Sequence, residues 1–496
     1  MILESLKLKK TVVLYGAGNC AVWCIYVLKR EGIEVSFIVD NSIKKQGGDL
    51  KGIPIKNHTD SIGLINEMPV LISVADKNAN ESIRRLLLES GINEGQVLRY
   101  QDFREEMVML YASDYSADMV MDADEKSDRE LDRNISVLYD CQLFMLQRHG
   151  GISRYLYELI TRETDKTNNV EMFQGIHVSE ISLEGYKDRF RRYYATKAED
   201  DVFRWSDFLR GINKKLLDVF VSGHEPYDIY HPTYYEDYGI NNYRKKVLTV
   251  HDLIQEVYNL DKKTIDNKKN SIENSDGIIA VSNSTKRDLI DILAVREEKI
   301  RVIYLANSMT LTPTQDQMVD ENYILYVGNR GGYKNFATLL DAYSRSSYVG
   351  DVALVCFGGE EPNVEEIAQI CELGIEDRVF FRRGGDLELA NYYNQAEVFI
   401  YPSRYEGFGL PVLEAMHYGT PVISSNTSSL PEVAGDAAIM VCPERADEIA
   451  YQVDRLLNDE SLRRHYAQKG REREKLFSWE RCSYETHRFY CELIAG

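Results

Sequence analysis

Two glutamates, Glu406 and Glu414, enclose a segment of seven residues that contains two glycines and a proline. A strand-like run at 397–401 precedes this segment, and a helix-like run follows it. Pro411 suits the first turn of that helix, because the amide that proline lacks would have no intrahelical partner there. Free amides and the helix dipole at such an N-terminus favour an anion such as phosphate. A carboxylate at each end can take the hydroxyls of a ribose and of a sugar, so the segment predicts a sugar-nucleotide site.

Two cations, Arg330 and Lys334, lie beside paired glycines directly after the strand-like run 323–328. Arginine can hold a diphosphate with its planar fork, and lysine can hold it as a point charge. The pair therefore predicts a diphosphate contact, with a solvated basic turn as the alternative. Gly150 and Gly151 follow another strand-like run, and paired glycines either let backbone amides approach a ligand closely or simply form a turn.

The segment from Tyr401 to Glu414 resembles the retaining glycosyltransferases of family four, which have the GT-B fold and whose hallmark is two glutamates separated by seven residues. The resemblance covers residues 134–496 and is densest from 323 to 438. It predicts an α/β protein in which two Rossmann-like domains face each other across a cleft, preceded here by a third, small Rossmann-like domain. Three further phrases resemble the same family in the same order, at 419–423, 426–432 and 435–438.

The resemblance implies transfer of a sugar from a nucleoside diphosphate donor to a hydroxyl group, with retention of anomeric configuration and without a metal. In this family the first glutamate, here Glu406, contacts the transferred sugar, and the second, here Glu414, takes the ribose hydroxyls. An arginine and a lysine hold the diphosphate and help to neutralise its charge as it leaves. These correspond to Arg330 and Lys334, although the family spacing between the two is usually wider.

The family also places a histidine after a buried strand, where it contacts the sugar near the reacting carbon. His251 is the matching residue, with a role in capping the strand end or packing with Asp252 as the alternative. The resemblance thus gives His251, Glu406, Arg330 and Lys334 as candidate catalytic residues. The implied donor-binding residues are Gly150, Gly151, Arg330, Lys334, Glu406, Gly407, Phe408, Gly409, Leu410 and Glu414.

The donor and the acceptor are predicted by analogy alone. The phrases at 150–154 and 328–335 look most like bacterial mannosyltransferases, which makes GDP-mannose the first candidate donor and a UDP-sugar the second. The implied acceptor is a hydroxyl of a surface polysaccharide or of a lipid-linked glycan precursor, with a protein acceptor left open. Two other classes remain as alternatives: a GT-B sugar-nucleotide epimerase or hydrolase, and a non-catalytic assembly protein with an NAD-binding front domain.

Strand-like and helix-like runs alternate along three stretches of the chain, which is typical of parallel α/β sheets. We predict a Rossmann-like accessory domain at 1–112, an acidic linker at 113–133 and an acceptor-side domain at 134–310. A hinge at 310–322 leads to the nucleotide-sugar domain at 320–477, and a helix at 478–496 is expected to cross back to the acceptor-side domain, as in GT-B enzymes.

The front domain carries Gly16, Gly18 and Ala21 after a strand-like run, and Asp40 at the end of the next one. This is the pattern of a dinucleotide fingerprint, in which glycines approach the pyrophosphate and a carboxylate about 20 residues further on binds the ribose. It gives Gly16, Gly18 and Asp40 as an accessory site for NAD or another nucleotide. The alternative is a scaffold or docking module, since the domain contains no catalytic constellation.

The composition limits the partners of this chain. Its 59 Lys and Arg against 79 Asp and Glu give a formal net charge of −20, which argues against a nucleic-acid partner. The sequence has no apolar run of the ~18–20 residues that a transmembrane helix needs, no signal-peptide pattern and no Cys-x-x-Cys pair, so we expect a cytoplasmic location with free thiols. No Asp-x-Asp pair follows a strand, so we expect no metal and no required cofactor.

Basic and aromatic residues cluster at 189–194 and 203–210. They predict either peripheral association with the inner face of a membrane or an amphipathic helix that covers the core. The sequence leaves open whether the protein forms a homo-oligomer.

Overall fold

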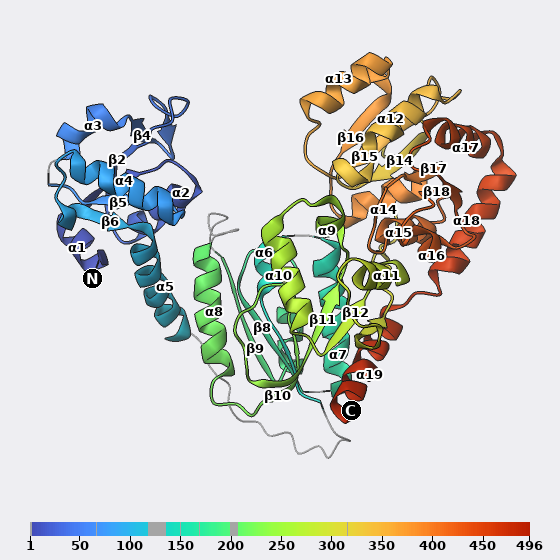
Figure 1. Cartoon of the computed structure of the whole chain (residues 1–496). Helices are drawn as coiled ribbons and strands as arrows, with labels where there is room; N and C mark the ends of the chain where they lie inside the picture. Colours follow the sequence, from blue (N-terminus) through green and yellow to red (C-terminus); the bar gives the residue numbers. More distant parts are fainter. Residues whose placement is uncertain are drawn as a thin grey trace.

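The computed structural model describes residues 2–65, 67–117, 135–148, 150–167, 169–198, 207–314 and 316–496. In these residues the strands form three sheets of six, seven and six strands, and every strand pairing but one is parallel. Each sheet is the centre of one α/β unit, and Figure 1 shows the unit with the seven-stranded sheet between the other two. We call these the front, middle and C-terminal units.

The front unit has the strand order β3-β4-β2-β1-β5-β6. Its central strand, β1, buries Val12, Val13 and Leu14 completely, as expected for a parallel strand that is covered on both faces. The strands are β1 (Thr11–Tyr15), β2 (Glu34–Val39), β3 (Asp49–Leu50), β4 (Ile53–Lys56), β5 (Val70–Ile72) and β6 (Val97–Arg99), and the helices are α1 (Ile2–Lys9), α2 (Asn19–Arg30), α3 (His58–Ile65), α4 (Lys77–Glu89) and α5 (Tyr100–Ala117).

The front unit packs against the middle unit through α5 and α8 (Asp207–Val221), which lie side by side in Figure 1. Trp23 of α2 stacks on Phe208 of α8, with ring centroids 4.7 Å apart. The two helices lie close together at Gly211, where an added Cβ atom would lie 3.0 Å from the Val108 side chain of α5. These contacts join the two units in one apolar core, which the sequence did not predict.

The first residues of the segment predicted as an acidic linker, 113–117, belong to α5, which is helical to Ala117. Tyr111 and Ala112 are buried at the preceding turn, and no glycine or proline interrupts the residues that follow. Residues 118–133 of the predicted linker lie outside the described residues. The same holds for 203–206 of the second basic and aromatic cluster.

The middle unit has the strand order β13-β12-β11-β10-β7-β8-β9. Part of the first basic and aromatic cluster lies in β9, an edge strand, so residues 192–194 are not helical. The strands are β7 (Val137–Tyr139), β8 (Val170–His177), β9 (Arg192–Lys197), β10 (Tyr227–His231), β11 (Tyr243–Val250), β12 (Gly277–Ala280) and β13 (Ile300–Val302). Besides α8, the helices are α6 (Gln142–Leu146), α7 (Gly151–Thr167), α9 (Ile254–Tyr258), α10 (Lys262–Glu273) and α11 (Asn283–Asp291).

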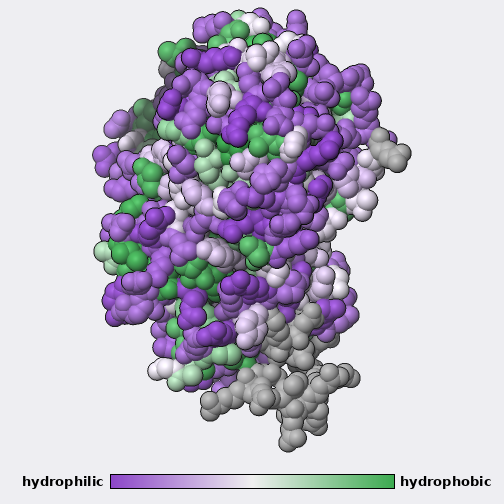
Figure 2. All heavy atoms as spheres, turned by 90° about the vertical axis from the view of Figure 1, so that its right-hand side faces the viewer, coloured by the Kyte–Doolittle hydropathy of each residue, from purple (hydrophilic) through white to green (hydrophobic). Residues whose placement is uncertain are grey.

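The C-terminal unit has the strand order β16-β15-β14-β17-β18-β19. Hydrophilic residues cover most of the molecular face seen in Figure 2, and hydrophobic residues form smaller groups among them. The strands are β14 (Tyr323–Val327), β15 (Ala353–Phe357), β16 (Val379–Arg382), β17 (Val398–Tyr401), β18 (Val422–Ser425) and β19 (Ile439–Val441). The helices are α12 (Phe336–Arg345), α13 (Val364–Leu373), α14 (Asp386–Gln395), α15 (Leu410–Tyr418), α16 (Leu430–Ala434), α17 (Ala446–Asn458) and α18 (Glu460–Glu474), followed by α19 (Trp479–Ala495).

The last helix, α19, leaves the C-terminal unit and packs on α7 and β11 of the middle unit. Its Tyr490 hydroxyl lies 3.0 Å from the Tyr139 hydroxyl and 2.5 Å from Nδ1 of His231, all three buried. The described residues between β13 and β14 form neither helix nor strand, and they include all but residue 315 of the segment 310–322 that was predicted as a hinge. Among the described helices, none has the length and apolar character needed to span a bilayer.

Candidate active site

A cavity of about 460 Å³ lies between the middle and C-terminal units and is lined by residues of both. The segment from the end of α6 to the start of α7 contributes to it, as do the loops that follow β11, β14 and β17, because the carboxyl ends of these parallel strands face the gap. The cavity brings together these predicted site residues: Gly150, Gly151, His251, Lys334, Glu406, Gly407, Phe408, Gly409, Leu410 and Glu414.

The N-terminus of α15 opens into this cavity, and Pro411 occupies its first turn as the sequence predicted. Gly409 precedes the helix with φ of 103°, a conformation that residues with a side chain rarely adopt. At Gly407 an added Cβ atom would lie 1.7 Å from the carbonyl oxygen of His251. Glycine at position 407 is therefore what lets the C-terminal unit approach the middle unit so closely.

Two serines of the loop between β18 and α16 fix the shape of segment 406–409 through hydrogen bonds. The Ser429 hydroxyl lies 2.8 Å from the carbonyl oxygen of Glu406 and 2.9 Å from that of Phe408. The amide of Glu406 donates to the Ser428 hydroxyl at 2.9 Å. Sequence reasoning noticed this region only as a family phrase and assigned these serines no role.

Lys334 and Glu406 form a nearly buried ion pair in the cavity. The Lys334 ammonium lies 2.6 Å from Oε1 of Glu406 and 2.9 Å from the Tyr401 hydroxyl. Burial alone would lower the pKa of Lys334, but the Glu406 carboxylate, with Tyr401 and Tyr333, raises it well above its ordinary value. Lys334 is therefore a permanent cation in a site with low water access, where its charge acts strongly on a ligand.

Glu414 lines the same cavity, on the first turns of α15. Its Oε2 accepts a hydrogen bond from the Tyr393 hydroxyl at 2.9 Å, and its Oε1 lies 4.0 Å from Nη1 of Arg154. Burial raises the pKa of Glu414 above its ordinary value, against the opposing effect of the Arg154 guanidinium and the Tyr393 hydroxyl. Arg154 in turn donates to Asp386 at 2.8 Å, across the boundary between the two units.

Arg154 also lines the cavity. It belongs to the family-like motif at 150–154, but the sequence analysis does not predict it as a site residue. The signal was its spacing: it lies three residues after Gly151, on the first turns of α7, and residues at that spacing share one face of a helix. The structure thus adds a second cation to the site. Arg154 comes from α7 of the middle unit, whereas Lys334 comes from the C-terminal unit.

His251 follows β11 and faces the same cavity. Its ring meets the ring of Tyr155 edge to face, with centroids 5.0 Å apart. Burial, with a smaller contribution from the Lys268 ammonium, lowers the pKa of His251 to about 3. The imidazole is therefore neutral near neutral pH, and it can orient a hydroxyl by hydrogen bonding without adding charge.

Tyr155 connects His251 to the buried network under α19. The Tyr155 hydroxyl lies 2.9 Å from Oγ1 of Thr249, and this oxygen lies 3.0 Å from Nε2 of His231. Tyr490 completes the chain at Nδ1 of the same histidine. His231 is thus a structural residue outside the cavity, and burial lowers its pKa to about 3.

Arg330 is the predicted donor-binding residue that the structure does not bring to the cavity. Its Nε lies 3.1 Å from Glu366, and its Nη1 donates to the carbonyl oxygen of Gly358 at 3.1 Å. The guanidinium also lies 4.8 Å from the centroid of the Phe381 ring. These partners lie in α13, in β16 and in the loop after β15, so Arg330 stabilises the C-terminal unit. Of the predicted pair, Lys334 lines the cavity and Arg330 does not.

The accessory site predicted in the front unit lies apart from this cavity. Gly16 adopts φ of 107°, and Asp40 is turned onto the glycine loop: its Oδ2 accepts from the amide of Ala17 at 2.7 Å. Its Oδ1 accepts from the amide of Ser42 at 2.8 Å. A ribose would have to compete with these backbone donors, so the geometry favours a role for Asp40 in shaping the loop.

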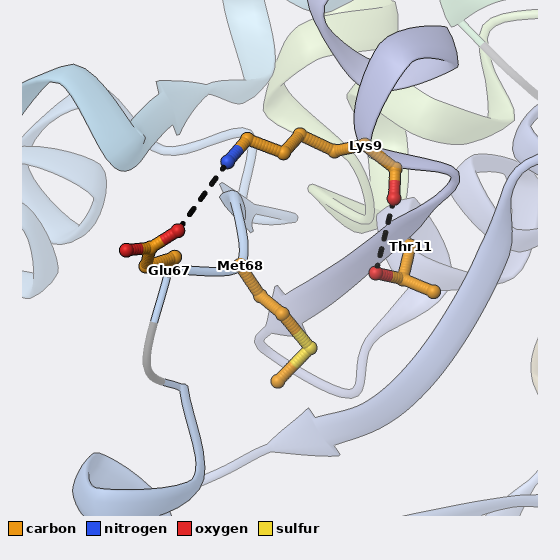
Figure 3. Close-up of a pocket in the computed structure, with 4 residues that line it drawn as sticks. All are labelled: Lys9, Thr11, Glu67 and Met68. Atoms are coloured by element: carbon orange, nitrogen blue, oxygen red, sulfur yellow. Dashed lines mark hydrogen bonds and ion pairs between the residues drawn. The ribbon is translucent and has the colours of Figure 1, made fainter.

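Figure 3 shows a hollow at another edge of the front unit, lined by Lys9, Thr11, Glu67 and Met68. The Lys9 ammonium lies 3.9 Å from Glu67, and both charged groups are largely exposed. Such a solvated pair contributes little binding energy. None of the predicted site residues lines this hollow, and no group of three or more metal-ligating side chains occurs in the described parts of the chain.

Two family models match the units that form the cavity. Residues 149–306 match the model described as Glycosyltransferase Family 4, and residues 313–473 match the model described as Glycosyl transferases group 1. Together the two matches cover more than half of the chain. The chain belongs to this family of glycosyltransferases, as the resemblance of its motifs predicted.

Two curated relatives are mannosyltransferases by name. The O-antigen chain mannosyltransferase B of Escherichia coli is 33% identical over 238 residues, which are 44% of this chain and 61% of that protein. The MMP alpha-(1->4)-mannosyltransferase of Mycolicibacterium hassiacum is 34% identical over 223 residues, 44% of this chain and 54% of that protein. The chain therefore spans little more than half the length of these relatives.

A solved structure resembles most of this chain in fold. The sucrose-phosphate synthase of Thermosynechococcus elongatus superimposes with a TM-score of 0.59 at 22% identity, over 73% of this chain and 100% of that one. The likeness confirms the predicted GT-B architecture of two facing Rossmann-like domains. The front unit, with its own six-stranded sheet, precedes these two domains in the chain.

Proposed function

We propose that this protein is a retaining, metal-independent glycosyltransferase that moves a hexose from a nucleoside diphosphate sugar to a hydroxyl of a surface polysaccharide or of a lipid-linked glycan precursor. One observation carries the proposal: Lys334, Glu406, Glu414 and His251 line a single cavity together with the N-terminus of α15. GDP-mannose is the first candidate donor, supported by the two relatives named as mannosyltransferases, and a UDP-sugar is the second.

The proposed reaction uses the permanent charges of the cavity. Lys334 and the amides at the start of α15 neutralise the charge that develops on the leaving diphosphate. The bond from the sugar C1 to the diphosphate oxygen breaks, and the bond from C1 to the acceptor oxygen forms on the same face. The acceptor proton passes to the departing phosphate oxygen, so no protein base is needed.

The remaining cavity residues orient the donor in this proposal. Glu414 accepts the ribose hydroxyls, and Glu406 and neutral His251 accept or donate hydrogen bonds to the transferred sugar. Arg154 takes the place that sequence reasoning gave to Arg330, because its guanidinium reaches the cavity. We place the reaction in the cytoplasm, at the inner face of the membrane where a lipid-linked acceptor would be reached.

The test is a turnover and thermal-shift screen against GDP-mannose, UDP-, dTDP- and ADP-sugars, with NAD included. One nucleotide sugar is expected to raise the melting temperature by mass action and to be consumed. Lys334→Ala should lower that turnover by about 100-fold, whereas the control Lys469→Ala removes only an exposed pair with Asp436 and should leave it unchanged.

Two outcomes would overturn the proposal. If only NAD stabilised the protein, the activity would belong to the front unit. If the sugar were epimerised or released to water even with every acceptor offered, the epimerase or hydrolase alternative would hold.

A further inference from the structure

Cys491, His487 and Glu163 form a hydrogen-bonded triad where α19 packs on α7 (Figure 1). Sγ of Cys491 lies 3.6 Å from Nε2 of His487, and Nδ1 of the same ring lies 3.3 Å from Oε2 of Glu163. The cysteine and the histidine are four residues apart on α19, a spacing that places them on one face of the helix. None of the three lines the donor cavity. Their order is that of a nucleophile, a base and a group that orients the base.

Glu163 fixes the orientation of the histidine ring. It lies completely buried on α7, and its Oε1 accepts a hydrogen bond from the Ser483 hydroxyl at 3.0 Å. Because a carboxylate has no donor, the proton of the neutral ring lies on Nδ1, toward Glu163. Nε2 then presents a lone pair to the Cys491 sulfur. The ring is therefore placed to take the thiol proton.

The sulfur of this triad is open to solvent. Cys491 is exposed on α19, and the His487 side chain is 26% exposed. The neighbouring residue Glu492 pairs with Arg488 at 2.9 Å and with Arg301 of β13. Such charged, hydrated surroundings favour a small polar electrophile over an apolar acyl chain, because the chain would displace water from these charges.

The local environment makes a base necessary for reaction at this sulfur. Partial burial, followed by the charge of Glu163, raises the pKa of the Cys491 thiol above its ordinary value. The thiolate is the reactive form of cysteine, so without help Cys491 would react more slowly than an ordinary exposed cysteine. A histidine that accepts the proton during the reaction reverses this order. The rate at Cys491 therefore reports directly on the role of His487.

We propose that Cys491 is a site of reversible oxidation by peroxide, with His487 as its base and Glu163 as the residue that positions the base. The thiol proton passes to Nε2 while Sγ attacks one peroxide oxygen. The O–O bond breaks and the S–O bond forms, and the departing oxygen takes the proton from Nε2 and leaves as water. Sulfur loses two electrons and the peroxide gains them.

The product of this step is a sulfenic acid, a reversible state of cysteine. Two equivalents of a small thiol return it to the free cysteine through a mixed disulfide, with release of water and of the oxidised thiol. The inference does not depend on the proposed glycosyltransferase function, and it adds a modification site on the opposite side of α7 from no cavity residue that the reaction uses.

The test measures how fast each exposed cysteine of the intact protein is oxidised. The full chain is treated with hydrogen peroxide in the presence of dimedone, which labels sulfenic acids, and the labelled peptides are quantified by mass spectrometry. Cys371 on α13 is the internal control, because it is also exposed and has no histidine partner among the described hydrogen bonds. Labelling of Cys491 should be about tenfold faster than that of Cys371, or more.

Two variants separate base catalysis from a structural role. His487→Ala should slow labelling of Cys491 by about tenfold or more, and imidazole added to the solution should restore part of the rate. Glu163→Gln should also slow it, by about threefold or more, because the ring loses the acceptor that orients it. Labelling of Cys371 should stay unchanged in both variants. If the buried substitution Glu163→Gln prevents folding, His487→Ala carries the test, since this histidine is partly exposed.

Each result decides the inference. Labelling of Cys491 that is no faster than that of Cys371, or that is unchanged in His487→Ala, would overturn it. A loss in His487→Ala that imidazole does not restore would assign the histidine a structural role instead. Oxidised Cys491 that dithiothreitol does not return to the thiol would contradict the reversibility.

Discussion

Glu406→Gln should change nucleotide binding and turnover in opposite directions. In the structure the Lys334 ammonium is held by the Glu406 carboxylate at 2.6 Å. A diphosphate that binds Lys334 must therefore weaken this pair, and it must also approach a carboxylate of its own sign. Glutamine keeps the shape of the side chain and removes the charge, so it releases Lys334 for the ligand.

The size of the effect follows from the kind of hydrogen bond that is exchanged. A bond to a charged group contributes about 1.5–3 kcal/mol, against about 0.5–1.5 kcal/mol for a neutral one. The difference of about 1–1.5 kcal/mol corresponds to about tenfold in affinity. GDP should therefore bind about tenfold more tightly to Glu406→Gln. Turnover should fall by about 100-fold or more, because a charged contact to the transferred sugar is lost.

The assay is isothermal titration with GDP and with UDP, alongside steady-state turnover of the matching sugar. Glu444→Gln is the matched control, because Glu444 pairs with Arg404, two residues before Glu406, but is more than half exposed. It should change neither quantity. Weaker or unchanged nucleotide affinity in Glu406→Gln, or turnover within about threefold of the wild type, would refute the assignment of this pair to the donor site.

Three further predictions concern other parts of the molecule. Burial raises the pKa of Glu414 above its ordinary value of 4.5, so the ionised carboxylate destabilises the folded protein at higher pH. The melting temperature of Glu414→Gln should therefore exceed that of the wild type above pH 4.5 and equal it below that pH. The same variant should bind GDP more weakly in titrations. Gly407→Ala, whose Cβ would meet the His251 carbonyl oxygen, should lower turnover by about 100-fold. Trp23→Ala removes the stack on Phe208 and should cost about 3–5 kcal/mol of unfolding free energy in urea titrations.

Each of these predictions has a result that contradicts it. A lower melting temperature for Glu414→Gln at neutral pH would mean that the ionised carboxylate stabilises the fold. Wild-type turnover in Gly407→Ala would show that the two units do not meet at this loop during catalysis. An unchanged urea midpoint for Trp23→Ala would remove the front unit from the shared core.

The strands at the cavity were predictable because parallel strands covered on both faces are continuous apolar runs. The predicted runs at 323–328 and 397–401 correspond to β14 and β17, and Pro411 marked the start of α15. The direction of Arg330 was not predictable, since it depends on Glu366 and on a carbonyl oxygen of a distant loop.

Contacts between units were equally hidden in the sequence. The stack of Trp23 on Phe208 and the contact between α5 and α8 join residues that no local pattern relates. A smaller cavity of about 140 Å³ likewise combines Tyr234 of the middle unit with Tyr333 of the C-terminal unit. The abundance of tyrosine was visible in the composition, but only the folded chain assembles three of the rings into one wall.

The most direct test of the central claim is hydrogen–deuterium exchange of the whole chain with and without GDP-mannose, with NAD as the comparison ligand. The account predicts slower exchange of amides in three segments from both units, 150–154, 328–334 and 406–414, and no change in the front unit. Protection confined to residues 16–45 of the front unit, or no protection at saturating nucleotide sugar, would contradict it.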